Sequence, residues 1–137
     1  TSADQRSENN RSCVLKISSQ AGSILLTGDI EASVEQQLVE RYGTRLQAAA
    51  LVVPHHGSKT SSTEALINAV NPGYAVVSSG YRNRFGHPHP TVVARYRQRN
   101  IVLLNTADQG AVTLTFRKGK ELSVFGYRNR HRRYWFD

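Results

Sequence analysis

The feature that most constrains the fold is a repeated order of an apolar run, a polar loop and a helical pattern. The runs AAALVV at residues 48–53 and YAVVS at residues 74–78 each lead into a polar segment. Both runs are too short for a buried helix and lack alternation, which is typical of strands covered on both faces. Helical patterns follow, opened by a capping box at Ser61 and Glu64 and by Thr91. This order predicts a layered α/β fold, with a mixed sheet and flanking helices.

A hairpin and a helix precede these units, and three strands follow them. The apolar residues 13–17 and 23–26 predict the hairpin. Ser33 with Gln36 predicts the capping box of a helix that ends at Gly43. The last strands are expected at residues 101–104, 111–116 and 122–127.

The chain has 137 residues, enough for one domain or most of one. It contains no Met and no targeting segment, so we expect a piece of a longer protein. No apolar run approaches the ~20 residues that span a bilayer, so this segment is not expected to lie within a membrane. The single cysteine, Cys13, excludes an internal disulfide and is expected to be buried. We divide the chain into a flexible leader (1–11), a main domain (12–127) and a basic tail (128–137).

The positive charge is concentrated in two segments. The net charge is +8; residues 81–99 carry five arginines and no acid, and residues 117–137 carry seven Lys or Arg against two acids. A basic stripe of this kind can neutralise the phosphates of a polyanion. A solvated face and a disordered tail explain the same charges equally well. The candidate nucleic-acid-binding residues are Arg82, Arg84, Arg95 and Arg99.

Polar motifs follow the ends of the predicted strands, where the loops of an α/β sheet converge to make sites. The first is Thr27-Gly28-Asp29. The Asp29 carboxylate can bind a metal, cap the next helix, or do both. Taken alone, the motif favours a cap or a turn, because Asp fills those roles so often.

The segment Pro54-His55-His56-Gly57-Ser58 carries a stronger chemical signal. Adjacent imidazoles point in different directions, so one can ligate a metal while the other faces a substrate. Ser58 can hold an imidazole in the required tautomer without itself binding the metal. Two surface histidines with satisfied hydrogen bonds are the alternative.

A third motif, Gly86-His87-Pro88-His89-Pro90, places two histidines on one side of an extended segment. Both rings could in principle meet one ion. We expect His87 to be functional and His89 to be structural. The fifth histidine, His131, is assigned to the basic tail.

In this order, TGD (27–29), PHHGS (54–58) and SGYRNRFGHP (79–88) resemble the motifs of the metallo-β-lactamase-type domain at the end of ComEC competence proteins. The resemblance covers roughly residues 12–116. It implies a partial αββα fold, of which this chain would be the C-terminal half.

The resemblance also implies roles for five residues. Asp29 resembles the carboxylate that bridges two metal ions, and His56 resembles a ligand of the second ion. His55 resembles the neighbouring histidine that contacts the scissile phosphate. His87 and Asn83 would line the same catalytic pocket.

The superfamily's main ligand cluster, HxHxDH, is absent, since His55 is the first histidine in the chain. A two-metal site needs several ligands on each ion. We therefore expect two divalent ions, Zn or Mn, in a longer parent protein, and none retained by this chain alone. We expect this chain by itself to be inactive or nearly so.

For the parent, the resemblance implies DNA uptake and the hydrolysis of phosphodiester bonds in DNA. The partners would be single-stranded or duplex DNA, the preceding half of the domain and a transmembrane channel. The chain would be a soluble domain of a bacterial inner-membrane protein, with the periplasmic side favoured. The alternatives are a non-catalytic DNA-binding module on a hydrolase fold, and another phosphoesterase of the superfamily, such as a phosphocholine esterase.

Overall fold

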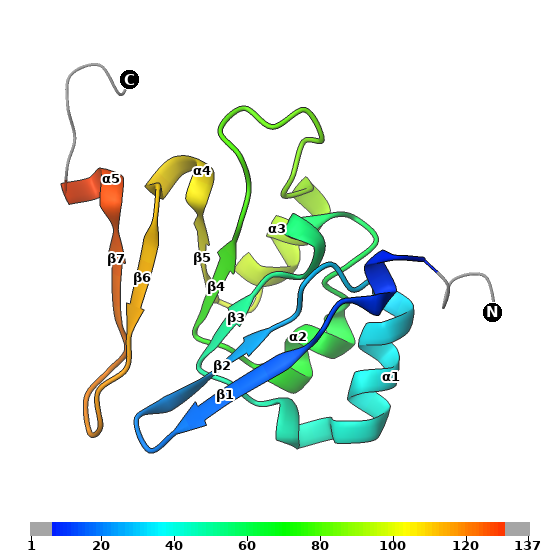
Figure 1. Ribbon diagram of the computed structural model, residues 1–137, viewed down its shortest axis with the longest axis horizontal. Helices are drawn as coiled ribbons and strands as arrows, with labels where there is room; N and C mark the ends of the chain where they lie inside the picture. The colour runs from blue at the N-terminus through cyan, green and yellow to red at the C-terminus, as the bar shows by residue number, and fades with distance from the viewer. Residues whose placement is uncertain (1–6, 131–137) are drawn as a thin grey trace.

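The computed structural model describes residues 7–130, and Figure 1 shows the arrangement of its elements. Five strands form one sheet in the order β1-β2-β3-β4-β5. β1 runs antiparallel to β2, and all other neighbours are parallel. A separate antiparallel pair, β6 and β7, stands beside this sheet. The strands are β1 (Leu15–Ser19), β2 (Gly22–Leu26), β3 (Ala50–Val52), β4 (Tyr74–Val77), β5 (Val102–Asn105), β6 (Val112–Thr115) and β7 (Ser123–Gly126).

Helices connect the parallel strands, so the predicted layered α/β fold with a mixed sheet is confirmed. None of the helices in residues 7–130 is long and apolar enough to cross a membrane. The helices are α1 (Ala32–Tyr42), α2 (Glu64–Val70), α3 (Pro90–Arg97), α4 (Thr106–Gln109) and α5 (Tyr127–Arg130). Three 3₁₀ turns are η2 (Asn9–Arg11), η3 (Gly43–Leu46) and η4 (Pro54–Gly57).

One face of the sheet is closed by helices. Leu25 of β2 and Leu51 of β3 are fully buried and share a core with Leu66 and Ile67 of α2 and with Tyr96 of α3. Leu25 and Leu51 lie on the same side of the sheet because they are paired in register, and the side chains of α2 and α3 pack against that side. This core fixes β2, β3 and β4 side by side.

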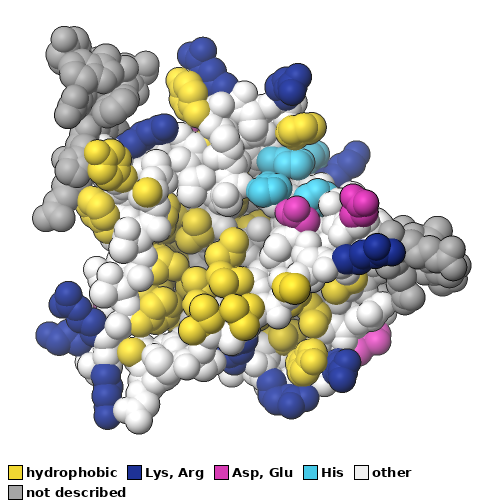
Figure 2. Space-filling view, in the orientation of Figure 1, with side chains coloured by type: hydrophobic (Ala, Val, Ile, Leu, Met, Phe, Trp, Pro, Cys, Tyr) yellow, Lys and Arg dark blue, Asp and Glu magenta, His cyan; other side chains and the backbone are white. Residues whose placement is uncertain are grey.

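The opposite face is apolar and only partly covered by the described residues, since Val76 is buried while Leu15 is exposed. The strand register aligns one side chain from each strand in a row of Leu15, Leu26, Val52, Val76 and Leu104. Leu15 at the edge is 54% exposed, and Figure 2 shows hydrophobic side chains gathered over the sheet. The prediction that residues 48–53 form a strand covered on both faces is confirmed at Ala50 and Leu51, which are fully buried on opposite faces, but not at Val52, which is half-buried. The strand also spans three residues rather than six. Residues 7–130 therefore leave part of this face uncovered.

Both predicted capping boxes lie two residues from the actual helix starts. α1 follows Glu31, and Ser33, already inside the helix, accepts a hydrogen bond from Asn10 instead. α2 is capped by Thr63, whose side chain accepts the N–H of Leu66. The Ser61 hydroxyl is used within the preceding loop, so it is not available to cap the helix.

The N-terminal boundary also lies earlier than expected. Residues 9–11 of the predicted leader form a 3₁₀ turn, and Asn10 Oδ1 accepts the Glu31 N–H at 2.9 Å. Cys13 is exposed rather than buried, because it precedes β1, whose residues are all exposed. Residues 1–6, and residues 131–137 of the predicted tail with His131, lie outside the described part of the chain.

Candidate functional site

The predicted site residues meet at one edge of the sheet. β2, β3 and β4 are neighbouring parallel strands, so the loops that follow them leave the sheet together (Figure 1). These loops carry Asp29, the pair His55 and His56, and the segment 78–89. Figure 2 shows histidine and acidic side chains adjacent on this edge.

The turn that carries the paired histidines has an unusual backbone. His55 and His56 have φ values of 49° and 55°, in the left-handed region that non-glycine residues rarely adopt. Each such residue costs on the order of 1–3 kcal/mol and persists only where the surroundings enforce it. Here the His55 N–H donates to the Gly28 carbonyl at 2.9 Å, and the His89 N–H donates to the Gly57 carbonyl at 2.8 Å. Strain held in this way is typical of functional sites.

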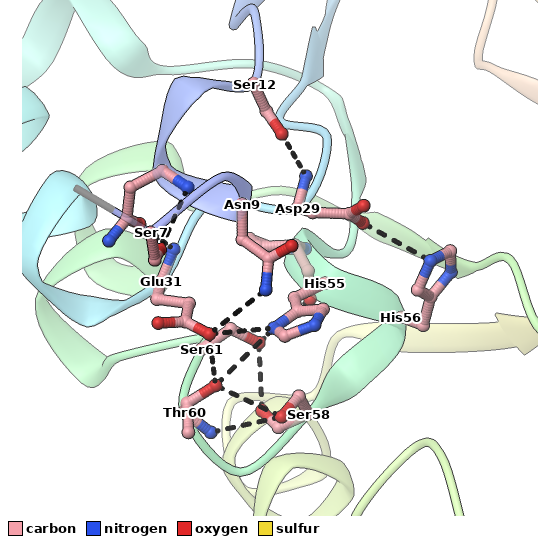
Figure 3. Close-up of polar contacts among 12 residues, drawn as sticks. Ser7, Asn9, Ser12, Asp29, Glu31, His55, His56, Ser58, Thr60 and Ser61 are labelled. Carbon is pink, nitrogen blue, oxygen red and sulfur yellow. Dashed lines mark hydrogen bonds and ion pairs between the residues drawn. The ribbon is translucent and has the colours of Figure 1, made fainter. Parts of the chain in front are cut away.

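The side chains of His56 and Asp29 face each other, and each presents a hydrogen-bond acceptor to the other (Figure 3). Nδ1 of His56 lies 2.6 Å from the carbonyl oxygen of Ser78, so in a neutral ring this nitrogen carries the proton. Nε2 then presents a lone pair to Asp29 Oδ1, 3.2 Å away. Both side chains are nearly half exposed. Two acceptors at this separation require a proton or a cation between them.

A divalent metal ion fits this pair of atoms. Metal-bound histidines commonly donate their second ring N–H to a backbone carbonyl, as His56 does to Ser78. Two ligands at about 2.1 Å from one tetrahedral ion lie roughly 3.4 Å apart, close to the observed Nε2–Oδ1 separation. Asp29 is further held by its N–H, which donates to Ser12 Oγ at 3.1 Å. Within residues 7–130, no group of three or more His, Cys, Asp or Glu side chains is placed to hold an ion. The pair is thus suited to be part of a metal site.

His55 points away from Asp29, toward a different set of partners. Its Nδ1 lies 3.4 Å from Glu31 Oε1 and 3.5 Å from Thr60 Oγ1. Its ring lies 6.4 Å from that of His56 and 6.1 Å from that of His87. The two adjacent imidazoles thus have different neighbours, as expected from the sequence.

Ser58 does not contact an imidazole, which corrects the expectation that it holds one directly. Its side-chain oxygen lies 3.1 Å from Thr60 Oγ1 (Figure 3). Thr60, in turn, contacts both His55 and Glu31. Sequence reasoning missed Thr60 and Glu31, because neither belongs to a motif and both reach the site through loop geometry.

A cavity of about 420 Å³ opens beside His56, between the loops after β3 and β4. Asn83 shapes this cavity from within its own loop. Its Nδ2 donates to the His87 carbonyl at 2.8 Å, and its Oδ1 accepts the His87 N–H at 3.0 Å. The cavity is lined by His56, Ser78, Ser79, Gly80, Asn83, Phe85 and His87.

His87 has a lowered pKa. Burial is the main cause, and the positive charges that His55, His56 and His89 can carry add to it. The neutral form of His87 is therefore favoured, and a neutral imidazole can donate one hydrogen bond and accept one. His89 is structural, as expected, since its Nδ1 accepts the Thr91 N–H and caps α3.

The four candidate arginines fall into two pairs. Arg82 and Arg84 are exposed on the loop that forms the cavity. Arg95 donates to the carbonyls of Ser61 and Ser62, and Arg99 donates to Asn68 and pairs with Glu64. The second pair binds within the protein, so the structure brings only the first pair to the site.

Comparison with known proteins gives a consistent set of relatives. A sequence profile of the metallo-β-lactamase superfamily matches residues 7–81. The chain is 43% identical over 112 residues to competence protein ComA of Neisseria gonorrhoeae, covering 82% of this chain and 16% of that protein. It is 40% identical over 111 residues to recombination protein 2 of Haemophilus influenzae, covering 81% and 14%. It is 35% identical over 114 residues to ComE operon protein 3 of Bacillus subtilis, covering 83% and 15%. The chain thus matches about one-sixth or less of the length of these relatives.

Proposed function

Since the chain belongs to the metallo-β-lactamase superfamily, we propose that it supplies part of a two-metal site that hydrolyses phosphodiester bonds in DNA. The observation that carries this proposal is the Asp29–His56 pair, whose two acceptors face each other at 3.2 Å. Bound Zn²⁺ or Mn²⁺ would activate a water and stabilise the attacking and leaving oxygens. In this assignment Asp29 and His56 would be the residues of this chain that hold the ions.

The remaining residues of the edge act on the phosphate. His55, whose Nδ1 lies toward Glu31 and Thr60 and whose ring lies 6.1 Å from that of His87, is assigned the contact with the scissile group. Neutral His87 offers one donor and one acceptor, and Asn83 holds the loop that places it. Arg82 and Arg84 attract the polyanion to the cavity.

The open apolar face supports the proposal that a second protein layer completes the domain. Five aligned apolar side chains on a sheet face favour burial by about 25 cal/mol per Å² of area covered. The preceding half of the same domain, carrying the remaining metal ligands, is the proposed occupant. A half placed there would border the same edge as Asp29.

The relatives support a role in DNA uptake, because one is named a competence protein and another a ComE operon protein. We place the domain next to a transmembrane DNA channel in a bacterial inner-membrane protein, on the periplasmic side. One observation favours a second candidate, a DNA-binding module without catalysis. Within residues 7–130 the ligands for a complete metal centre are not present.

The experiment is a hydrolysis assay on the longest natural chain that carries this sequence. A labelled oligonucleotide is incubated with Mn²⁺ or Zn²⁺ and either the wild type, Asp29→Ala or Glu121→Ala. Glu121 is an exposed carboxylate in the β6–β7 turn and serves as the matched control. We expect Asp29→Ala to lose at least about 100-fold in rate, since even partners outside the ligand set cost 10–100-fold. Glu121→Ala should cleave like the wild type. A wild type that binds but never cleaves DNA would favour the binding module.

A further inference from the structure

The loop of residues 80–87 carries the two most exposed large hydrophobic side chains in the described chain. Phe85 is 77% exposed and Tyr81 is 63% exposed. Isolated exposed apolar residues are common on protein surfaces. Here, however, both aromatics belong to one loop that also carries Arg82 and Arg84 and borders the cavity.

One face of the Phe85 ring contacts another side chain, and the other face is exposed to solvent. Its ring stacks on His87 with centroids 5.9 Å apart and planes 29° from parallel. Because the side chain is 77% exposed, its outer face is free for a second planar group. Phe85 and His87 both line the cavity beside His56. A ring stacked there would lie next to the proposed metal edge.

Two arginine side chains lie over the ring of Tyr81, which belongs to the same loop. The guanidinium carbons of Arg82 and Arg128 lie 5.2 Å and 5.6 Å from its ring centroid. Arg128 also donates a hydrogen bond to the Ala107 carbonyl, which joins α5 to α4, so its contact with the Tyr81 ring places the loop beside these helices. One cation on the loop and one on α5 therefore lie against the Tyr81 ring.

The loop is also pre-shaped. The Asn83 side chain bridges it through both hydrogen bonds to the His87 backbone. Arg82 at φ 51° and Gly86 at φ 64° make its turns in the left-handed region. A platform already in its binding shape loses little conformational entropy when a ligand stacks on it.

We propose that Phe85 stacks on an unpaired base, while Arg82, Arg84 and Arg128 neutralise the neighbouring phosphates and the Tyr81 ring supports Arg82 and Arg128. The ligand class is therefore single-stranded nucleic acid, since bases of a duplex are already stacked on one another and offer no free face at this loop. Stacking platforms flanked by cations are the usual means of binding single strands without sequence preference. This inference rests on the proposed function, which identifies the polyanion as DNA. It narrows the ligand from DNA in general to unpaired strands.

The test compares two probes with equal phosphate counts. One is a fluorescent 12-nucleotide oligo-dT, and the other is a 12-unit strand of abasic sites. Binding is measured by anisotropy, in the longest natural chain and with EDTA present, for Phe85→Ala, Phe85→Trp and Tyr42→Ala. Tyr42 is the matched control, an exposed Tyr with Arg41 and Arg45 over its ring, at the end of α1, which lies far from the loop after β4 (Figure 1).

Phe85→Ala should weaken oligo-dT binding by about 5- to 150-fold, the usual worth of one stacked base. Binding of the abasic strand should change by less than twofold. Phe85→Trp should retain affinity, and the fluorescence of that Trp should be quenched by oligo-dT but not by the abasic strand. Tyr42→Ala should affect neither probe.

Equal losses for both probes, or no loss for either, would overturn the inference. So would tighter binding of a 12-base-pair duplex than of oligo-dT at the same phosphate concentration. The outcome is separate from that of the hydrolysis assay, because no cleavage occurs in EDTA. A chain that shows the base-dependent loss but never cleaves DNA would keep this inference and remove only the hydrolase.

Discussion

The segment 54–63 connects two polar regions whose hydrogen bonding differs sharply. On one side lies the metal edge, Asp29 and His56, nearly half exposed and with two acceptors facing each other. On the other lies the Glu35 anchor, where a fully buried carboxylate accepts the N–H groups of Ser62 at 2.6 Å and Thr63 at 2.7 Å. The anchor is completed by Tyr96, which shares a hydrogen bond with Ser62, and by the positive charge of Arg95.

This difference in hydrogen bonding distinguishes polar groups that stabilise the fold from polar groups that are suited to bind a ligand. Buried polar groups that stabilise a fold are normally satisfied, and those of the anchor are. Burial raises the pKa of Glu35, although the N–H donors and Arg95 act in the opposite direction. Burial also raises the pKa of Tyr96. The metal edge instead keeps an acceptor pair that only a proton or a cation can satisfy, so we expect it to contribute binding rather than stability.

The largest effect on stability should come from the anchor. Glu35→Ala leaves the N–H groups of Ser62 and Thr63 without their acceptor, at about 1–3 kcal/mol each, so the expected loss is about 3–5 kcal/mol. Urea denaturation measures the loss. Glu40→Ala, an exposed carboxylate on the same helix, should cost less than about 0.5 kcal/mol. A loss below about 1 kcal/mol for Glu35→Ala would show that the anchor is not structural.

Gly57 lies between the two regions and should give the next largest effect. A Cβ there would lie 2.6 Å from Pro88 Cβ, with φ at 78°. Gly57→Ala should cost about 2–3 kcal/mol, from backbone strain and forced repacking. Gly119→Ala, at φ 72° but with nothing within 4 Å of the new Cβ, isolates the backbone part and should cost about 1 kcal/mol. Equal losses for the two variants would mean that the contact with Pro88 is not tight.

The pH dependence of stability should also distinguish the regions. The pKa of Glu35 is higher in the folded protein than its usual value of 4.5, so the native state binds this proton more tightly. Its contribution to stability is fully present below pH 4.5 and is lost as pH rises through the raised pKa. The free energy of unfolding of the wild type, relative to Glu35→Gln, should therefore increase as pH falls from 7 to 4.5. A difference that is constant over this range, or that shrinks, would contradict the assignment.

The smallest effect should come from the metal edge without metal. Asp29 and His56 are exposed enough that their pairing adds about 0–1 kcal/mol. Asp29→Asn and His56→Gln should therefore unfold within about 0.5 kcal/mol of the wild type in EDTA. Losses as large as that of Glu35→Ala would remove the contrast between the regions.

The strand-loop-helix order predicted the sheet edge correctly because periodicity and loop residues are local signals. It placed Asp29, the paired histidines and the loop of Asn83 and His87 at one edge, where the structure has them. It did not predict which arginines are free, because the partners of Arg95 lie more than 30 residues away in sequence.

The helix starts and the coverage of the sheet were missed for related reasons. Ser61 carries the right residue type for a cap, but the loop itself uses its hydroxyl. Residues 48–53 have the composition of a strand covered on both faces, yet the described chain covers one of those faces only in part, at Ala50 but not fully at Val52. The composition of a strand indicates that its faces need to be covered, and the structure shows which residues cover them.

The most direct test of the metal edge is the metal content of two adjacent variants, His55→Ala and His56→Ala, in the longest natural chain that carries this sequence. If His56 is a ligand, His56→Ala should lose bound metal and hydrolytic activity together. If His55 contacts the scissile group, His55→Ala should keep its metal while kcat falls by about 10²- to 10⁴-fold. The reverse result, with metal lost from His55→Ala and kept by His56→Ala, would contradict the account.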